Sequence, residues 1–414
     1  MTMIKRLYLI STLVLATSVS ATEFRITDQK AFEEVAAKVN PGDTVILQDG
    51  TWPDAILKIQ ATGTSDHPIT IKAETPGKVI FTGNSKISLA GQHLIVDGLW
   101  FQNPSGSESI ELRIDAKNLA RHCRITNCAV TNDEPGIEKK GTSRFLSVYG
   151  SKHRIDHCYF AGKTSGGPTA VIWLASEQNV AHQIDHNHFG PRQRLGRNGG
   201  ETIRVGDSDT SMLTAACIVE YNLFEKCDGE AECISNKSCG NIYRCNHFVE
   251  VSGTLTLRHG NDCLVKDNVF LGNGAKGSGG VRVIGEDHLV TGNRFQDLKG
   301  GDERSALCLM LGIPDSPANG YFQVKQAEII DNIFLNCEHN ILIGMKGHSK
   351  ARLAPIESII SGNRIQTNKG KAFEILCEVN GVKMDENTVG KERPAGISDA
   401  LPLKEAGPKW RNRL

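Results

Sequence analysis

The sequence VEYNLF at 219–224 returns as YRCNHF at 243–248 and as VKDNVF at 265–270. Each copy has an apolar residue, two variable residues, Asn, one variable residue and Phe. Two earlier copies carry Cys in the Asn position, ITNCAV at 125–130 and IDHCYF at 155–160. Neighbouring copies lie 22 to 39 residues apart. The residues in the Asn position are Cys128, Cys158, Asn187, Asn222, Asn246, Asn268, Asn293, Asn332, Asn363 and Asn387.

A period of this length, built from short β-like runs, is typical of a solenoid. We therefore predict an all-β fold, a right-handed parallel β-helix, with aliphatic residues inside and Asn side chains stacked at one turn. Residues 27–39 carry a helix pattern with Thr27 or Asp28 as N-cap, and this helix is expected to cover the first coil. The period lengthens at 190–215 and 298–326, which predicts longer loops there, where function is commonly found.

The two ends of the chain differ from the repeat. Residues 1–21 have the pattern of a secretory signal peptide, with Lys5 and Arg6 before an apolar run and small residues at its end. We predict a single β-helix domain over 22–390 and a C-terminal tail over 391–414. The mature protein is expected to be exported, either to the periplasm or to the medium.

The composition limits the classes of partner. The chain has 47 basic and 47 acidic residues, so no overall field favours nucleic acid or a membrane surface. The sequence does not define the oligomeric state. The twelve cysteines form no C-x-x-C pair, which argues against a zinc site. We expect mostly buried thiols, and one or two disulfides stay open as an alternative.

The stretch 228–259 holds a dense group of ionisable residues. Glu230 and Glu232 are two positions apart, so on an extended strand they point to the same face. Adjacent carboxylates repel each other unless a proton or cation lies between them, and Ca²⁺ is a hard cation that takes oxygen ligands. Lys237 follows on the same coil. On spacing alone, an exposed strand with solvated Glu and Lys is the alternative interpretation.

Stacked coils bring residues that are distant in sequence to one face. Asn198 lies in a loop before the strand-like ETIRVG at 201–206, and Arg258 and His259 come one coil after the glutamate pair. Arg282 lies one coil further on. An amide oxygen, two carboxylates and several cations can therefore line one groove.

Four motifs, in this order, resemble the polysaccharide lyases grouped with chondroitinase B and a set of alginate lyases. The resemblance covers residues 25 to 390 approximately. The motifs are NGGETIRVG (198–206), GEAECISNKS (229–238), GTLTLRHGN (253–261) and GGVRVIG (279–285).

The resemblance implies a role for each matching position. Calcium ligands are implied at Asn198, Glu230 and Glu232. Lys237 matches the general base, and Arg258 the arginine on the leaving-group side. Substrate contacts are implied at His259, Arg282 and Arg304.

The implied reaction is β-elimination on a uronate polymer, an anionic polysaccharide. Arg282 makes the chain look more like the alginate lyases, and the segment PDSPANGYF at 314–322 lacks an acidic residue expected in chondroitinase B. Alginate is therefore the first expected substrate, and chondroitin or dermatan sulfate the second. Two other functions stay open: a hydrolase of the polygalacturonase kind, which would need paired Asp, and a non-catalytic carbohydrate-binding scaffold.

Overall fold

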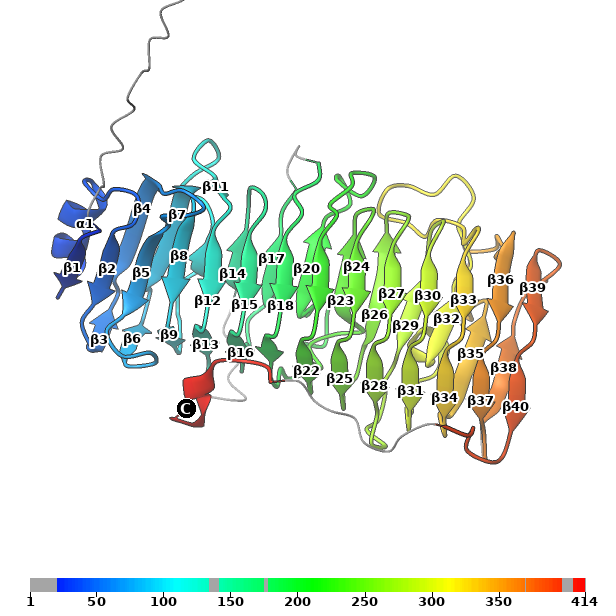
Figure 1. Cartoon of the computed structure of the whole chain (residues 1–414). Helices are drawn as coiled ribbons and strands as arrows, with labels where there is room; N and C mark the ends of the chain where they lie inside the picture. Colours follow the sequence, from blue (N-terminus) through cyan, green and yellow to red (C-terminus); the bar gives the residue numbers. More distant parts are fainter. Residues whose placement is uncertain (1–20, 134–140, 175–177, 369, 397–404, 414) are drawn as a thin grey trace, which may run out of the picture.

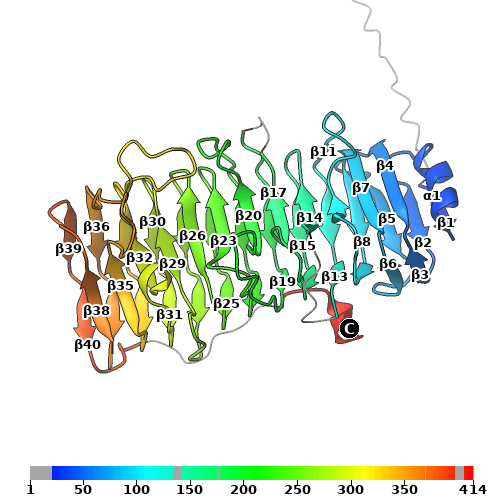
Figure 2. The same cartoon turned by 180° about the vertical axis from the view of Figure 1, so that it is seen from behind.

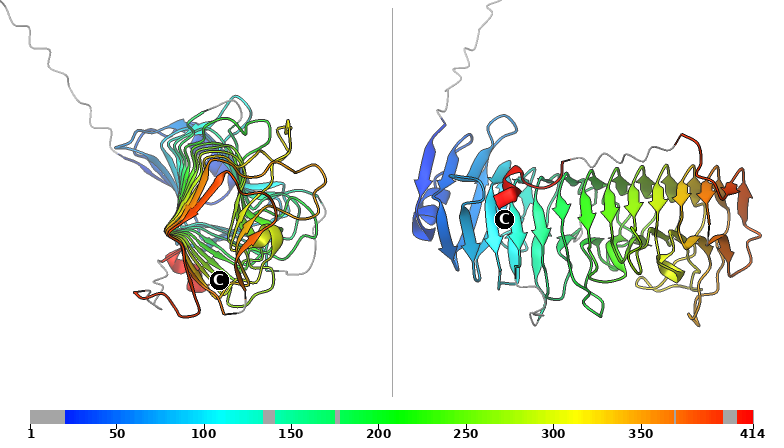
Figure 3. Two further views of the ribbon diagram at one scale, coloured as in Figure 1. Left: turned by 90° about the vertical axis from the view of Figure 1, so that its right-hand side faces the viewer. Right: turned by 90° about the horizontal axis from the view of Figure 1, so that it is seen from below.

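The computed structural model describes residues 21–133, 141–174, 178–368, 370–396 and 405–413. All of the predicted signal peptide except residue 21 lies outside the described residues. The chain forms a right-handed parallel β-helix whose coils superimpose when seen along the long axis (Figures 1, 2 and 3). The predicted fold class is confirmed.

Three parallel sheets run the length of the solenoid, and each coil contributes one strand to each sheet along most of its length. Sheet 1 consists of β1 (Glu23–Ile26), β2 (Thr44–Leu47), β5 (Ile69–Ala73), β8 (Leu94–Asp97), β12 (Arg124–Thr126), β15 (Arg154–Asp156), β18 (Gln183–Asp185), β21 (Ile218–Glu220), β24 (Ile242–Arg244), β27 (Leu264–Lys266), β30 (Leu289–Thr291), β33 (Glu328–Ile330), β36 (Ser358–Ser361) and β39 (Val382–Asp385). Sheet 2 consists of β3 (Gly50–Pro53), β6 (Val79–Thr82), β9 (Leu99–Gln102), β13 (Ala129–Thr131), β16 (Tyr159–Ala161), β19 (His188–Phe189), β22 (Leu223–Glu225), β25 (His247–Val249), β28 (Val269–Leu271), β31 (Arg294–Gln296), β34 (Ile333–Leu335), β37 (Arg364–Gln366) and β40 (Thr388–Gly390). Sheet 3 consists of β4 (Ile56–Thr62), β7 (Lys86–Gln92), β10 (Glu108–Glu111), β11 (Ala120–Arg121), β14 (Arg144–Val148), β17 (Ala170–Ile172), β20 (Ile203–Gly206), β23 (Glu232–Lys237), β26 (Thr254–His259), β29 (Val281–Val283), β32 (Leu307–Leu309), β35 (His339–Ile343) and β38 (Lys371–Ile375).

The Asn position of the repeat forms the turn between sheets 1 and 2. Asn246 donates through Nδ2 to Asn268 Oδ1 (3.0 Å) and to the carbonyl oxygen of Val219 (2.8 Å). The residue before it, Cys245, has a left-handed backbone (φ 55°). The same contacts repeat along the ladder, so buried amide groups are satisfied by the neighbouring coils. This confirms the expected stack of Asn side chains.

The Phe position of the repeat forms a second ladder inside the solenoid. The rings of Phe224, Phe248 and Phe270 stack with centroids 4.6 and 4.5 Å apart. Each of these side chains is at most 2% exposed. Because the Asn and Phe ladders hold one corner of every coil in register, the outer face of sheet 3 is a rigid support for side chains.

The predicted capping helix is present as α1 (Gln29–Ala36) and lies at the N-terminal end of the solenoid (Figure 1). Asp28 is the N-cap, and its Oδ1 accepts from the backbone N–H of Ala31 (2.9 Å). Phe32 and Val35 are buried in the main core. The helix ends earlier than the sequence pattern predicts.

The two predicted long loops are each interrupted by a strand of sheet 3. Strand β20 lies within 190–215, and β32 together with the 3₁₀ helix η1 (Asp302–Arg304) lies within 298–326. The chain therefore leaves the solenoid on both sides of sheet 3 at these coils, and the excursions border the same face.

The end of the chain turns back along the solenoid. Residues 405–413, which include the 3₁₀ helix η2 (Lys409–Arg413), pack beside β13 and β16 (Figures 1 and 3). Trp410 is 7% exposed and donates through Nε1 to the carbonyl oxygen of Asn127 (2.9 Å). The predicted tail thus contributes a packed segment to coils far from it in sequence.

All twelve cysteines lie in described residues and are free thiols, mostly buried. Of the two alternatives, buried thiols are the one observed, and no disulfide joins these residues. Among the described helices, none is long and apolar enough to cross a membrane.

Candidate active site

Five of the predicted site residues, His259 at the end of β26 among them, lie on three neighbouring strands of sheet 3. Glu232 begins β23 and Lys237 ends it, Arg258 lies in β26, and Arg282 lies in β29. Strand β23 pairs with β26, and β26 pairs with β29. The stacking of coils therefore brings together residues that are up to 50 positions apart in the sequence.

The expectation that Glu230 and Glu232 share one strand is wrong. Strand β23 begins at Glu232, and Glu230 lies in a bend before it. The two carboxylates nevertheless interact, because Glu232 is one of the charges that raise the pKa of Glu230. Proximity here comes from the bend and not from the two-residue period of a strand.

A third carboxylate, Glu201, lies close to Glu230 and is missing from the sequence prediction. We call Glu201, Glu230 and Glu232 the acidic group. Burial, followed by repulsion from Glu201 and Glu232, raises the pKa of Glu230 to about 8. Glu201 is 6% exposed, and its Oε2 is buried without a hydrogen-bond partner. The signal for Glu201 was available, since it is the acidic residue of NGGETIRVG, three positions after Asn198.

Asn198, Glu230 and Arg304 line one cavity of about 270 Å³. Asn198 is exposed and Arg304 extends from η1, three coils beyond β23. The predicted contact residue Arg304 is thus beside the predicted metal ligands. The cavity also contains Arg194 and Arg197, which the sequence analysis did not single out.

Two arginines flank Glu232 on its other side. Arg258 Nε and Arg282 Nη1 each lie 3.5 Å from Glu232 Oε1. Ser235 Oγ donates to Glu232 Oε2 (2.5 Å). Lys237, at the other end of β23 and paired with His259, is partly exposed and makes no ion pair with any residue that the structure describes.

Arg258 occupies an irregular position in its strand. Asn236 pairs with Leu257 and Lys237 pairs with His259, so Arg258 is the extra residue of a bulge. A bulge turns the direction of a side chain, which explains why adjacent Arg258 and His259 both face the site.

The loop between β32 and β33 holds Arg258 from above. Its guanidinium donates to the carbonyl oxygens of Gly320 (2.5 Å) and Asn319 (3.0 Å). Its Cζ lies 4.5 Å from the ring centroid of Tyr321, and that of Arg282 lies 5.4 Å from the same centroid. Tyr321 was not among the site residues predicted from the sequence.

His259 is a neutral neighbour of Arg258. Burial, with repulsion from Arg258 and Lys237, lowers its pKa to about 3. Its Nε2 accepts from Arg258 Nη1 (2.9 Å), which places the proton on Nδ1, a buried atom without a partner. His259 is only 1% exposed. Its hydrogen bond helps to hold Arg258 in place, and its Nδ1–H donor is unused.

The acidic group has the donor chemistry of a hard-cation site. Among the residues that the structure describes, no three His, Cys, Asp or Glu side chains are arranged as a set of metal ligands. Glu232 points to the two arginines. The site nevertheless offers an amide oxygen and three carboxyl groups. Of these, Glu201 has a buried oxygen without a hydrogen-bond partner, and Glu230 tends to retain its proton. These groups fit Ca²⁺, which prefers several oxygen ligands including carboxylates.

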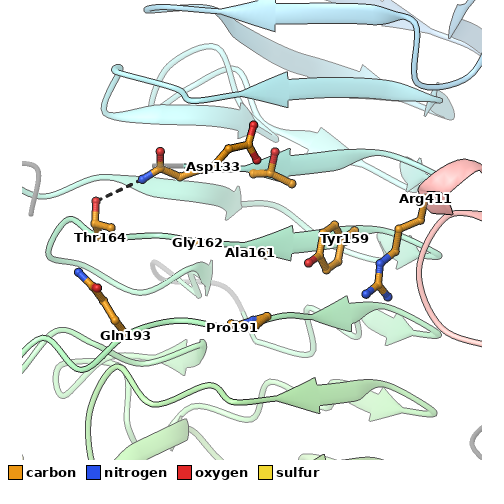
Figure 4. A pocket seen from close by; sticks show the side chains of 10 residues that line it. Asp133, Tyr159, Ala161, Gly162, Thr164, Pro191, Gln193 and Arg411 are labelled. Carbon is orange, nitrogen blue, oxygen red and sulfur yellow. Dashed lines mark hydrogen bonds between the residues drawn. The ribbon is translucent and has the colours of Figure 1, made fainter. Parts of the chain in front are cut away.

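A larger cavity of about 450 Å³ lies outside this group (Figure 4). Tyr159, Gln193 and Arg411 line it, and Arg411 reaches it from the C-terminal segment. Among its described lining residues, Asp133 is the one carboxylate, and they contain no cluster of acid and base. The ionisable groups that suit catalysis are instead gathered on sheet 3.

Comparison with known proteins agrees with this geometry. A family model described as Chondroitinase B matches residues 26–400. The PL6 family alginate lyase AlyGC is 39% identical, with a TM-score of 0.86, and the match covers 91% of this chain and 52% of that chain. This chain therefore spans about half the length of AlyGC. No match was found in a comparison with curated proteins.

Two further solved structures extend the comparison. A mannuronic acid specific polysaccharide family 6 lyase from human gut microbiota is 32% identical, with a TM-score of 0.79 and coverage of 86% of this chain and 82% of that chain. The PL6 family polysaccharide lyase Pedsa3628 from Pseudopedobacter saltans is 24% identical, with a TM-score of 0.81 and coverage of 93% and 99%. The second of these shows the same fold.

Proposed function

Because the chain belongs to the chondroitinase B family, we propose that it is a calcium-dependent polysaccharide lyase that cleaves alginate by β-elimination. The observation that carries this proposal is that Glu232, Lys237, Arg258 and Arg282 lie on three paired strands of sheet 3, with Glu230 close to both Glu201 and Glu232. The alginate lyase AlyGC, at 39% identity, supports alginate as the substrate.

Asn198, Glu201, Glu230 and Glu232 are the residues that would hold Ca²⁺. When bound, Ca²⁺ would neutralise the substrate carboxylate and so make the neighbouring C5 proton easier to remove. Arg282 and Arg304 supply further positive charge for the polymer. His259 keeps the Arg258 guanidinium in place.

Lys237 takes the C5 proton in our proposal. Its amine must be neutral for this role. As the C5–H bond breaks, its electron pair forms the C4=C5 double bond and the C4–O4 bond breaks. Arg258 stabilises the oxygen that leaves, and water supplies the proton to it, because a guanidinium rarely gives up a proton.

The direct test follows the ultraviolet absorbance of the unsaturated uronate product, with alginate and with dermatan sulfate, in calcium or in chelator. We expect absorbance to rise on alginate and chelator to abolish the rise. A response to dermatan sulfate alone would reject alginate but keep the elimination. Release of sugar ends without the absorbance would indicate hydrolysis, and binding without product would indicate a scaffold.

A further inference from the structure

Two buried cations lie directly behind the acidic group. Lys163 is 2% exposed and Arg192 is 3% exposed. Burial of a cation is unfavourable unless hydrogen bonds compensate for the lost hydration. Both residues belong to excursions between sheets 2 and 3, the excursions that enter the candidate active site.

Arg192 joins loops from two successive coils. Its Nη1 donates to the carbonyl oxygen of Glu201 (2.7 Å). Its Nη2 donates to the carbonyl oxygens of Gly167 (2.9 Å), Ser165 (3.2 Å) and Gly199 (3.4 Å). The planar guanidinium can reach all of these acceptors at once, which one ammonium group cannot.

Lys163 donates hydrogen bonds to the same loop, residues 165–167, that Arg192 contacts. Its Nζ donates to the carbonyl oxygens of Ser165 (2.7 Å), Gly166 (2.8 Å) and Gly167 (2.9 Å). Two buried basic side chains therefore hydrogen-bond to the backbone of the 165–167 loop. That loop is the surface against which the 199–201 segment rests.

The 199–201 segment in turn contacts the turn that carries Glu230. A Cβ on Gly200 would lie 2.4 Å from the carbonyl oxygen of Gly229, and one on Gly229 would lie 2.1 Å from that of Gly200. A Cβ on Gly229 would also lie 3.0 Å from Cδ and Nε of Arg192. The backbone that carries Glu201, the backbone that carries Glu230 and the Arg192 side chain are thus packed without space between them.

Burial lowers the pKa values of both Lys163 and Arg192. Burial, with repulsion from Arg192, lowers the pKa of Lys163 to about 6. Burial lowers the pKa of Arg192 to about 10, against the attraction of Glu201 and Glu230. Buried ionic groups are weak contributors to stability, so their presence beside an active site calls for a positional explanation.

We infer that Arg192, supported by Lys163, is a positioning residue that fixes Asn198, Glu201 and Glu230 in the arrangement needed to bind the metal. This inference rests on the proposed function. It assigns to Arg192 no contact with substrate, only control of the backbone that presents the ligands. Groups that orient metal ligands commonly change metal affinity by about 10–100-fold when removed.

The test compares Arg192→Met with Arg294→Met. Arg294 is also buried, at 8% exposure, but lies on β31 of sheet 2. Calcium binding is measured by titration calorimetry, folding by circular dichroism in chelator, and kcat and KM on alginate. We expect Arg192→Met to weaken calcium affinity by about tenfold or more, with kcat recovering as calcium is raised. Arg294→Met is expected to bind calcium as the wild type does.

Three outcomes separate the possibilities. Wild-type calcium affinity in folded Arg192→Met would overturn the positioning role and leave the proposed lyase intact. A wild-type chain that binds no calcium would overturn both. If Arg192→Met does not fold, calcium binding by Arg192→Lys tests the positioning role instead, because lysine keeps the positive charge but lacks the planar guanidinium with its several donors. We expect Arg192→Lys to lose calcium affinity, and full affinity in that variant would reject the inference.

Discussion

Arg258 and Tyr321 are 63 residues apart in sequence, yet the guanidinium Cζ lies 4.5 Å from the centre of the tyrosine ring. Arg258 also donates to the carbonyl oxygens of two consecutive residues of the same loop, Asn319 and Gly320. The β32–β33 loop therefore determines where the guanidinium points.

Removal of the Tyr321 ring should impair turnover. We expect Tyr321→Ala to lower kcat on alginate by about tenfold, the range of a partly buried cation–π contact. Tyr321→Phe keeps the ring and is expected to stay near wild type. Equal losses in both variants would show that the hydroxyl, and not the ring, matters.

Lys237 is expected to be essential for proton removal and dispensable for folding. Lys237→Ala should lower kcat by at least about 100-fold, the usual contribution of a general base. Its thermal unfolding and its binding to alginate should stay unchanged, since Lys237 is partly exposed and has no ion pair with described residues. Substantial elimination by this variant would remove Lys237 from the mechanism.

Glu201 should matter for calcium although it lies outside the E-x-E motif. Glu201→Gln removes one of the charges that repel Glu230, and we expect about tenfold weaker calcium affinity. The calcium-induced rise in Tm should shrink accordingly. Glu286→Gln is the control, because Glu286 is paired with Lys325 (3.0 Å), away from the acidic group. The same rise in Tm for Glu201→Gln and wild type would exclude Glu201 from the metal site.

The Asn ladder should carry much of the stability. Asn268 is fully buried and hydrogen-bonds to Asn246, Asn293 and the carbonyl oxygen of Tyr243. We expect Asn268→Ala to lower the free energy of unfolding by about 2–3 kcal/mol, because several buried groups lose their partner. Denaturant titration measures the loss, and a change below about 1 kcal/mol would contradict the ladder's importance.

A buried histidine should make the fold acid-sensitive. Burial lowers the pKa of His288 to about 4 from its ordinary value of 6.5. On acidification the unfolded chain therefore binds a proton at this histidine before the folded chain does. The contribution of neutral, buried His288 to the free energy of unfolding is complete above pH 6.5 and declines as the pH falls toward 4. Complete loss of this contribution lowers the free energy of unfolding by roughly 3 kcal/mol.

His288→Asn removes the titration and keeps the hydrogen bond. His288 Nδ1 accepts from the backbone N–H of Cys263, and Asn241 accepts in the same way from Cys217 two coils earlier. We expect stability of the variant to depend less on pH between 6.5 and 4, as measured by denaturant unfolding at several pH values. The exposed His67→Asn is the control. An unchanged pH slope in His288→Asn would contradict the assignment.

The sequence was sufficient for the fold and for much of the site. Asn246 and Phe248 belong to a unit that returns on most coils, and a periodic unit can be recognised without knowledge of distant contacts. Because coils stack in order, the periodicity also predicts that Glu232, Lys237, Arg258 and Arg282 share one face. The catalytic and metal roles of these residues stay predictions until the experiments above are done.

Other relationships were decided by the tertiary structure alone. Glu201 lies close to Glu230, Arg192 hydrogen-bonds to two loops, and the Tyr321 ring contacts Arg258. All three contacts are made by loops between strands, and the paths of these loops follow no repeat. The bend at Glu230 and the bulge at Arg258 likewise depend on how neighbouring coils pack. The physical reason is that ladder contacts recur at every coil and leave a pattern in the sequence, whereas a loop contact occurs once and is determined by the route of the chain.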